Sequence, residues 1–276
     1  MERIFFVILW VKTVITSFMK YIAIIPARYA STRFPGKPLA VLGGKTIIER
    51  VYRQVEKAVD TVYVATDDLR IFNTVLDFGG KVVMTSPNHK SGTDRIEEAV
   101  TTISSETGID YDVVINVQGD EPFVAVSQIQ TVMESFSDPA VSIATLGKPF
   151  VSPGEEITES HLRAIENPNS PKIAVSQQGY ALYFSRSVIP FIRGKEFSEW
   201  PSQFPFLKHI GLYAYRRHVL HEVTQLPQSP LELAESLEQL RWLENGYNIK
   251  VGITHVETIG IDTPEDFQRA EAFLKE

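Results

Sequence analysis

The sequence contains no cysteine. Disulfide bonds, zinc–thiolate sites, iron–sulfur clusters and cysteine nucleophiles are therefore excluded, and the composition fits a reducing compartment, so we expect a cytoplasmic protein. Basic charge is also scarce, because 27 Lys and Arg residues stand against 34 Asp and Glu residues and the formal net charge is -7. An acidic chain without a basic run is a poor candidate for binding nucleic acid or an anionic membrane.

A hydrophobic run long enough to cross a membrane is missing as well. The apolar residues 1–18 are interrupted by Lys12, and the part from 4 to 18 is shorter than the ~20 residues of a membrane span. No small-residue cleavage site follows, as a signal peptide would require. Since Met19 directly precedes a strand-like segment, we interpret residues 1–18 as an apolar extension from a mis-assigned start; an interfacial anchor is the alternative.

Residues 19–276 predict a single α/β domain. Short runs rich in Val and Ile alternate with stretches of helical periodicity, which is typical of a mostly parallel sheet with helices on both faces. The expected strands are 21–25, 61–66, 81–85, 111–117, 141–146, 179–185, 209–215 and 249–256. The expected helices lie near 46–58, 69–78, 93–104, 126–136, 216–225, 230–245 and 264–275. Residues 150–172 and 194–206 are expected to form loops, because they are rich in Pro, Ser and Glu.

Two common phosphate-binding signatures are absent. Neither G-x-x-x-x-G-K-[ST] nor G-x-G-x-x-G occurs, so neither a P-loop nor a dinucleotide fingerprint is expected. Instead, IIPARYASTRFPGKPL follows the first strand and carries Arg28, Arg33 and Lys37 on a proline-stiffened loop. Ligands of open α/β sheets bind beyond the carboxyl ends of the strands, so we interpret the three cations as a triphosphate cradle. A solvated basic loop is the alternative.

Two carboxylates follow other strands. Asp120 lies in NVQGDEP, after the strand at 111–117, and Asp262 lies in IGIDTPEDF. A carboxylate beside bound phosphates can hold Mg²⁺. The alternative is that each carboxylate caps a helix: Asp120 the helix that begins near 126, and Asp262 the helix that begins at Pro264. From the residues alone, Asp262 is best interpreted as a cap.

The segment NHKSGTDR, residues 88–95, is ambiguous. Ser91 and Arg95 offer a hydroxyl and a guanidinium group to a base or phosphate, whereas the alternative is a turn into a helix capped by Thr93.

Polar residues of the second half carry little signal of their own. Glu238 and Arg241 fit a solvent-exposed pair at i, i+3 of a helix. His209 fits a half-buried histidine whose hydrogen bonds are satisfied.

Taken together, the motifs resemble those of the 3-deoxy-manno-octulosonate (Kdo) cytidylyltransferases, the CMP-Kdo synthetase family. The blocks occur in the family's order over about residues 20–275: IIPARYASTRFPGKPL, VATDD, HKSGTDR, NVQGDEP, GYALYFSR, KHIGLY, SPLELAESLEQLR and GIDTPED. The resemblance implies a Rossmann-like nucleotide-diphospho-sugar transferase fold, with an inserted sugar-binding and dimerisation subdomain at about 150–215. It implies a homodimeric transferase that makes CMP-Kdo and pyrophosphate from CTP and Kdo for lipopolysaccharide biosynthesis.

The resemblance also implies a role for each matching residue. The expected CTP ligands are Arg28, Arg33, Lys37, Ser91, Arg95 and Gln118. The expected Kdo ligands are Gln118, Arg186, His209, Tyr213, Glu238 and Gln239. Asp120 and Asp262 are expected to bind Mg²⁺, with two ions in all, and to act in catalysis together with Arg28, Arg33 and Lys37. The alternatives are a cytidylyltransferase for another acidic sugar such as sialic acid, a non-catalytic nucleotide-binding module, and, remotely, an NAD-dependent oxidoreductase.

Overall fold

The computed structural model describes residues 19–30 and 33–274. The interpretation of residues 1–18 as an extension falls outside this part of the chain. Among the described residues, no helix has the length and apolar character needed to cross a bilayer.

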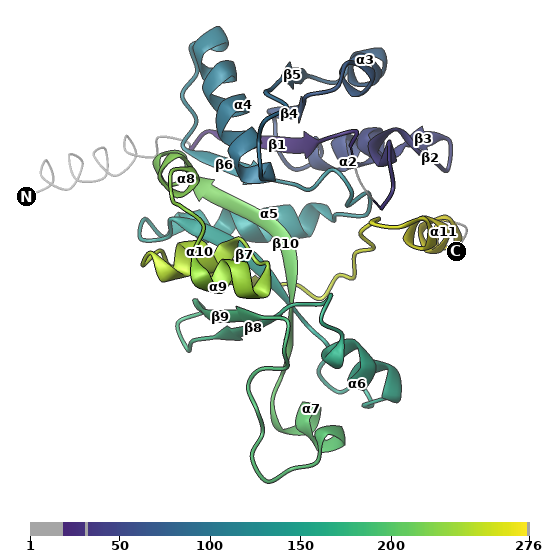
Figure 1. Cartoon of the computed structure of the whole chain (residues 1–276), viewed down its shortest axis with the longest axis vertical. Helices are drawn as coiled ribbons and strands as arrows, with labels where there is room; N and C mark the ends of the chain where they lie inside the picture. The colour runs from purple at the N-terminus through teal and green to yellow at the C-terminus, as the bar shows by residue number, and fades with distance from the viewer. Residues whose placement is uncertain (1–18, 31–32, 275–276) are drawn as a thin grey trace, which may run out of the picture.

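A mixed, mostly parallel sheet forms the middle of the molecule (Figure 1). Its main strands are β1 (Tyr21–Ala27), β4 (Val62–Thr66), β5 (Val82–Met84), β6 (Val113–Asn116), β7 (Ile143–Pro149), β10 (Leu207–Arg216) and β11 (Ile249–Ile253). They follow the order β11-β7-β10-β6-β1-β4-β5. Only β10 runs antiparallel to its neighbours β6 and β7, which confirms the predicted α/β class.

Helices cover both faces of this sheet. They are α2 (Ile47–Val55), α3 (Leu69–Asp77), α4 (Gly92–Thr107), α5 (Val126–Glu134), α8 (Arg217–Thr224), α9 (Pro230–Glu235), α10 (Gln239–Glu244) and α11 (Pro264–Phe273). One face packs against α2 and α5, and the other packs against α4, α8 and α10. A short hairpin, β2 (Val41–Leu42) and β3 (Lys45–Thr46), precedes α2, and the one-turn helix η2 (Ser135–Ser137) follows α5.

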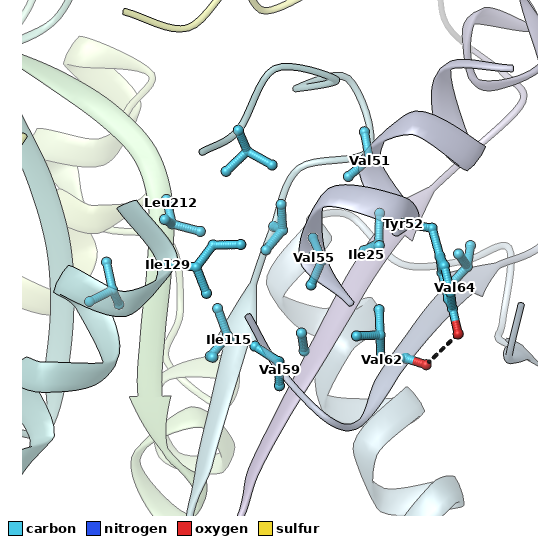
Figure 2. Close-up of a cluster of buried hydrophobic side chains, with 14 of the residues drawn as sticks. Ile25, Val51, Tyr52, Val55, Val59, Val62, Val64, Ile115, Ile129 and Leu212 are labelled. Carbon is cyan, nitrogen blue, oxygen red and sulfur yellow. Dashed lines mark hydrogen bonds between the residues drawn. The ribbon is translucent and has the colours of Figure 1, made fainter. Parts of the chain in front are cut away.

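The central strand β1 is apolar on both sides because it is buried on both sides. Ala23 and Ile25 point into the core under α2 and α5, whereas Ile22 and Ile24 point into the core under α4. This period of two is what a strand imposes on its side chains. Figure 2 shows the first of these cores, where Ile25 lies near residues of α2 and the neighbouring strands.

The sequence pattern missed structure in the second half. The segments expected to be loops contain α6 (Glu159–Glu166), η3 (Phe197–Glu199) and α7 (Trp200–Gln203). The hydroxyl group of Thr158 caps α6, and Trp200 packs with Phe206 in a small separate core. A hairpin of β8 (Lys172–Val175) and β9 (Ala181–Ser185) joins the sheet through β10, and β8 was not predicted.

The helix predicted over 230–245 is in fact two helices. Ser236 adopts a left-handed conformation (φ 51°) directly after α9, and α10 begins only at Gln239. A left-handed residue cannot continue an α-helix, which explains the break.

We expect Ile115→Ala to lower the free energy of unfolding by about 2–5 kcal/mol, because Ile115 is fully buried at the centre of β6 and its removal leaves a cavity. Leu69→Ala is the matched control, since Leu69 is 66% exposed. Its loss should stay below about 0.5 kcal/mol. Denaturant unfolding measures both values, and equal losses would contradict the placement of the core.

Candidate active site

A cavity of about 300 Å³ opens beyond the carboxyl ends of β1 and β6. Its size lies at the lower end of the range for small-molecule sites, about 300–1,000 Å³. It is lined by Pro26, Ala27, Arg28, Arg33, Lys37, Pro38, His89, Lys90, Ser91, Gly92, Arg95, Gln118, Gly119, Asp120 and Asp262. All eight residues expected to bind CTP or metal therefore lie in one cavity, although they come from four separate segments of the chain.

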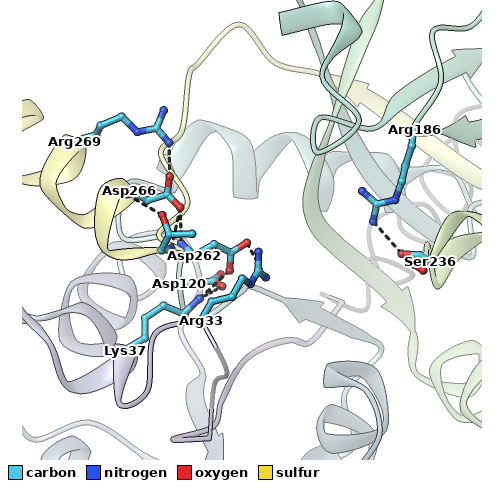
Figure 3. A network of polar contacts seen from close by, with 9 residues as sticks. Arg33, Lys37, Asp120, Arg186, Ser236, Asp262, Asp266 and Arg269 are labelled. Carbon is cyan, nitrogen blue, oxygen red and sulfur yellow. Dashed lines mark hydrogen bonds and ion pairs between the residues drawn. The ribbon is translucent and has the colours of Figure 1, made fainter.

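Lys37 lies at the base of this cavity and is buried. It begins the one-turn helix η1 (Lys37–Leu39), and Gly36 before it has a φ of 71°, which favours glycine. The Lys37 Nζ atom lies 2.6 Å from Asp120 Oδ2 and 3.1 Å from Asp262 Oδ1. A guanidinium nitrogen of Arg33 lies 3.3 Å from the other oxygen of Asp262, so the two carboxylates meet beside two cations (Figure 3).

Neither carboxylate is a helix cap. Thr263 caps α11 by accepting the backbone N–H of Asp266, so the capping interpretation of Asp262 is wrong. Asp120 lies before Ala125, the N-cap position of α5, where the side chain of Gln128 accepts the backbone N–H. The backbone N–H of Ile261 donates to the carbonyl oxygen of Asp120 at 2.9 Å and joins the two carboxylate-bearing loops.

The pair Asp120 and Asp262 fits a magnesium ion that also binds phosphate. Within residues 19–30 and 33–274, no group of three or more His, Asp or Glu side chains forms a complete metal site. Mg²⁺ does not need one, because it is usually bound by one or two carboxylates together with substrate phosphates and water. The position of the Lys37 ammonium group shows that both carboxylates converge on one cationic point.

The start of α4 forms another wall of the cavity. Ser91, and not Thr93 as the capping alternative expected, is the N-cap residue, and its hydroxyl group accepts the backbone N–H of Asp94. Arg95 is buried and donates to Asp67 at 2.8 Å and to Thr85 at 2.5 Å.

His89 and Lys90 also line the cavity, and sequence reasoning gave them no role. His89 pairs with Glu98, which also accepts the backbone N–H of Ser86. The signal that could have identified both residues was their place in the segment 88–95, directly after a strand.

Of the residues expected to bind Kdo, Gln118 lines the cavity, and the other five form two groups. His209 and Tyr213 lie on β10 with their ring centres 5.3 Å apart, and Tyr213 contacts Trp242 of α10. Glu238, one residue before α10, accepts a hydrogen bond of 2.8 Å from Thr93 at the start of α4. This first group therefore lies next to the cavity wall formed by Ser91.

Several polar atoms in and around the first group are buried without a hydrogen bond of good geometry to any described residue. They are the hydroxyl groups of Tyr213 and Tyr215, the side-chain amide nitrogen of Gln239 and the indole nitrogen of Trp242. Buried polar groups are nearly always paired in folded proteins, so such a concentration marks a candidate binding surface.

Arg186 forms the second group and lies well away from Asp120 and Asp262 (Figure 3). Its guanidinium group donates to the carbonyl oxygens of Glu235, Ser236 and Pro168. A sugar carboxylate at this position would have to replace some of these bonds.

The expected pair of Glu238 and Arg241 is present only as a long contact, and it is not solvent-exposed. Arg241 is buried and makes a bidentate ion pair with Glu232, at 2.8 and 2.5 Å, whereas its nearest approach to Glu238 is 3.9 Å. Sequence spacing placed Glu238 and Arg241 on the same side of a helix, but it did not reveal that Glu232 of α9 is the stronger partner of Arg241.

Burial changes the pKa of several groups near the site. It lowers the pKa of His209 to about 3, so the imidazole is neutral at physiological pH. Thr145 lies within hydrogen-bond distance of its Nε2 atom, at 3.2 Å. Burial, and then the charge of Asp120, raise the pKa of Glu121 to about 7. Burial also raises the pKa of Glu238.

Comparisons with known proteins identify the class of this chain. Residues 22–259 match the model of the family described as cytidylyltransferase, so the chain is a member of the cytidylyltransferases. At 12% identity and a TM-score of 0.55, 4-diphosphocytidyl-2C-methyl-D-erythritol synthase from Anaerococcus prevotii covers 93% of this chain and is covered to 97%. That likeness supports the nucleotidyltransferase fold alone.

Closer relatives narrow the class. The 3-deoxy-manno-octulosonate cytidylyltransferase of Phocaeicola vulgatus is 64% identical over 258 residues, which are 94% of this chain and 98% of the relative. The enzyme of that name from Thermodesulfovibrio yellowstonii is 47% identical over 93% of this chain and 98% of its own. A solved CMP:2-keto-3-deoxy-manno-octonic acid synthetase complexed with CTP has a TM-score of 0.81 and 39% identity, with 93% and 98% coverage. The chain belongs to the 3-deoxy-manno-octulosonate cytidylyltransferase family, as its motifs predicted.

We expect His209 to make the protein less stable as the pH falls below about 6.5, the usual histidine pKa. Between that pH and the folded-state pKa of about 3, the unfolded chain binds a proton that the folded chain does not. The free energy of unfolding therefore falls by up to about 1.4 kcal/mol per pH unit. Denaturant unfolding at pH 7.5 and 5.0 should show a weaker pH dependence for His209→Gln. The exposed His255→Gln should retain the wild-type dependence, and equal behaviour of the two variants would contradict the assignment.

Proposed function

We propose that the protein transfers the CMP group of CTP to Kdo, giving CMP-Kdo and pyrophosphate for lipopolysaccharide biosynthesis. The observation that carries the proposal is the convergence of three cations and two carboxylates on one cavity. Support comes from relatives of this activity that match nearly the whole chain, and from a similar structure that was solved in complex with CTP.

The triphosphate would bind at Arg28, Arg33 and Lys37. All three line the cavity, and an anion with several oxygens needs donors from several directions. Arg33 and Lys37 already contact carboxylates, so a phosphate group and its counter-ion would share them. Ser91, Arg95 and Gln118, which line the opposite wall, would contact the cytidine side.

Kdo would bind beside this cavity, against the buried polar surface of β10 and α10. The side chains of His209, Tyr213, Glu238 and Gln239 would supply hydrogen bonds to sugar hydroxyl groups. The buried Gln239 amide nitrogen, which has no hydrogen bond to a described residue, supports this choice. Gln118 would lie between nucleotide and sugar, and its amide already donates to Asn116 at 2.9 Å. Arg186 would pair with the sugar carboxylate after exchanging its backbone partners.

Asp120 and Asp262 would hold one of two magnesium ions. Bound there, Mg²⁺ would offset phosphate charge and lower the pKa of a nearby hydroxyl group. Lys37, which lies between the two carboxylates, would keep them in place and reduce their mutual repulsion.

The reaction needs no covalent enzyme intermediate. The anomeric hydroxyl oxygen of Kdo would attack the α-phosphorus of CTP and lose its proton, while the bond to the β-phosphate breaks and pyrophosphate leaves with the electron pair. The cavity cations would stabilise the charge on the departing pyrophosphate, so catalysis is mainly positioning and charge stabilisation.

We further propose a cytoplasmic homodimer, because the reaction consumes CTP and because apolar side chains after β7 are exposed. Phe191 is 74% exposed and Leu182 is 64% exposed. The segment of about 150–215 would serve both dimerisation and sugar binding.

Pyrophosphate release from CTP and Mg²⁺ tests the activity. We expect release with Kdo and none with sialic acid. Release only with sialic acid would retain the nucleotide chemistry and overturn the sugar. A folded sample that binds CTP but releases nothing with either sugar would favour a non-catalytic nucleotide-binding module.

We expect Asp120→Asn and Asp262→Asn each to lower kcat by about two to four orders of magnitude while CTP still binds, because each removes a charged oxygen donor. Glu159→Gln is the control, since Glu159 is exposed on α6. Steady-state kinetics and calorimetric CTP binding measure the two effects. Near-normal turnover at saturating Mg²⁺ would rule out the metal role of the substituted residue.

A further inference from the structure

We propose that Asp67 and Asp68, which follow β4, are positioning residues that hold two opposite walls of the nucleotide cavity. Asp68 acts through Arg70 on the loop that carries Arg28 and Lys37. Asp67 acts on Arg95. The proposal rests on the proposed function, because it assigns both residues to CTP binding. Both belong to the segment VATDD, for which sequence reasoning found no role.

Asp68 and Arg70 form a rigid pair at the start of α3. The Arg70 Nε atom donates to Asp68 Oδ1 at 3.0 Å and its Nη2 atom donates to Oδ2 at 2.7 Å. The same carboxylate is the N-cap of α3, because it accepts the backbone N–H of Arg70 at 2.9 Å. A bidentate pair on a capping residue fixes the plane of the guanidinium group.

This guanidinium plane lies over the ring of Tyr29. Its central carbon is 3.3 Å from the ring centre, which is a close cation–π contact. Tyr29 directly follows Arg28, which lines the cavity. Arg70 therefore contacts the phosphate-binding loop from outside, without reaching the cavity itself.

Tyr29 is coupled to Lys37 through Gly36, which contacts Tyr29 and immediately precedes Lys37. The backbone N–H of Gly36 donates to the Tyr29 carbonyl oxygen at 3.0 Å. A Cβ atom on Gly36 would lie 3.0 Å from the Tyr29 ring, so the ring packs directly on this glycine. Because Gly36 immediately precedes Lys37, displacement of the ring would move the buried ammonium group away from Asp120 and Asp262.

Asp67 supports the opposite wall. Its Oδ2 atom accepts from Arg95 Nη2 at 2.8 Å, and Thr85 accepts from the other guanidinium nitrogen. Both groups are largely buried, with side-chain exposures of 5% for Arg95 and 18% for Asp67. Arg95 lines the cavity with its direction set by these two acceptors.

An exposed ion pair alone contributes little to stability, and Arg70 is 58% exposed in its side chain. The consequence we assign to it is therefore a change in CTP binding and not in folding. Both aspartates support nucleotide-side walls. Their side-chain hydrogen bonds within the described part of the chain go to Arg70 and Arg95 and not to the residues expected to bind Kdo, so binding of the sugar should be spared.

Arg70→Ala tests the contact by which Asp68 acts on Tyr29 through Arg70. We expect the KM for CTP and the calorimetric Kd for CTP to rise about tenfold, with the KM for Kdo within about twofold of wild type. Tyr29→Ala should weaken CTP binding by a similar factor, and the double variant should bind CTP no more weakly than either single variant. Tyr29→Phe should keep the wild-type KM for CTP, because it keeps the ring. Arg163→Ala, which removes an exposed ion pair on α6, is the matched control.

Asp67→Asn tests the contact with Arg95 and should also raise the KM for CTP about tenfold. Because it leaves the buried Arg95 guanidinium group without its charged partner, it should lower the melting temperature as well, so binding and kinetics are measured well below that temperature. Unchanged CTP affinity in Arg70→Ala and Asp67→Asn would overturn the proposal, as would equal increases in the KM values for CTP and Kdo. Wild type that binds CTP without releasing pyrophosphate would refute only the proposed reaction. The effect of Arg70→Ala and Asp67→Asn on CTP binding could then still be measured by calorimetry. Wild type that does not bind CTP would refute both.

Discussion

The contact of one buried ammonium group with two carboxylates organises this molecule. Lys37, Asp120 and Asp262 come from segments 83 and 225 residues apart, and they meet within 3.1 Å. Two carboxylates brought this close repel each other unless a cation lies between them. Lys37 supplies that cation, so the site can be assembled before any ligand arrives. The same geometry offers a metal ion two hard oxygen donors directed at one point.

The sheet makes this meeting possible. β1 and β6 are parallel neighbours, so the loops that follow them leave from the same edge. Alternating residues of β1 enter two separate cores, which holds the strand from both faces and leaves the loop after Ala27 little freedom at its base. Burial of ordinary apolar side chains thus sets the position of the charged ones.

Much of the fold and most of the cavity beyond β1 and β6 could be predicted from the sequence, because both depend on the local pattern of apolar and polar residues. The runs of Val and Ile identified the parallel strands, and loops after parallel strands meet at one edge. Thr263 before Pro264 predicted the cap of α11 correctly. The role of Asp262 could not be predicted, because Asp262 is also a good capping residue and only the path of the chain places it beside Lys37. The pairing of Arg241 with Glu232 was missed for a similar reason: the partner lies beyond a helix break at Ser236 that spacing does not reveal.

The part of the site formed by β10 and α10 is stabilised differently from the part around Lys37. Around Lys37 the opposite charges neutralise each other. Near β10, by contrast, the Gln239 amide nitrogen and the Trp242 indole nitrogen are buried without a hydrogen bond to any described residue. An unpaired buried polar atom costs about 1–3 kcal/mol, so these two nitrogens are a cost to folding. A ligand rich in hydroxyl groups would recover that cost on binding and would be distinguished from one that lacks them. Under the proposed function, the charged half would therefore suit a nucleoside triphosphate, and selection among sugars would fall to the surface of β10 and α10.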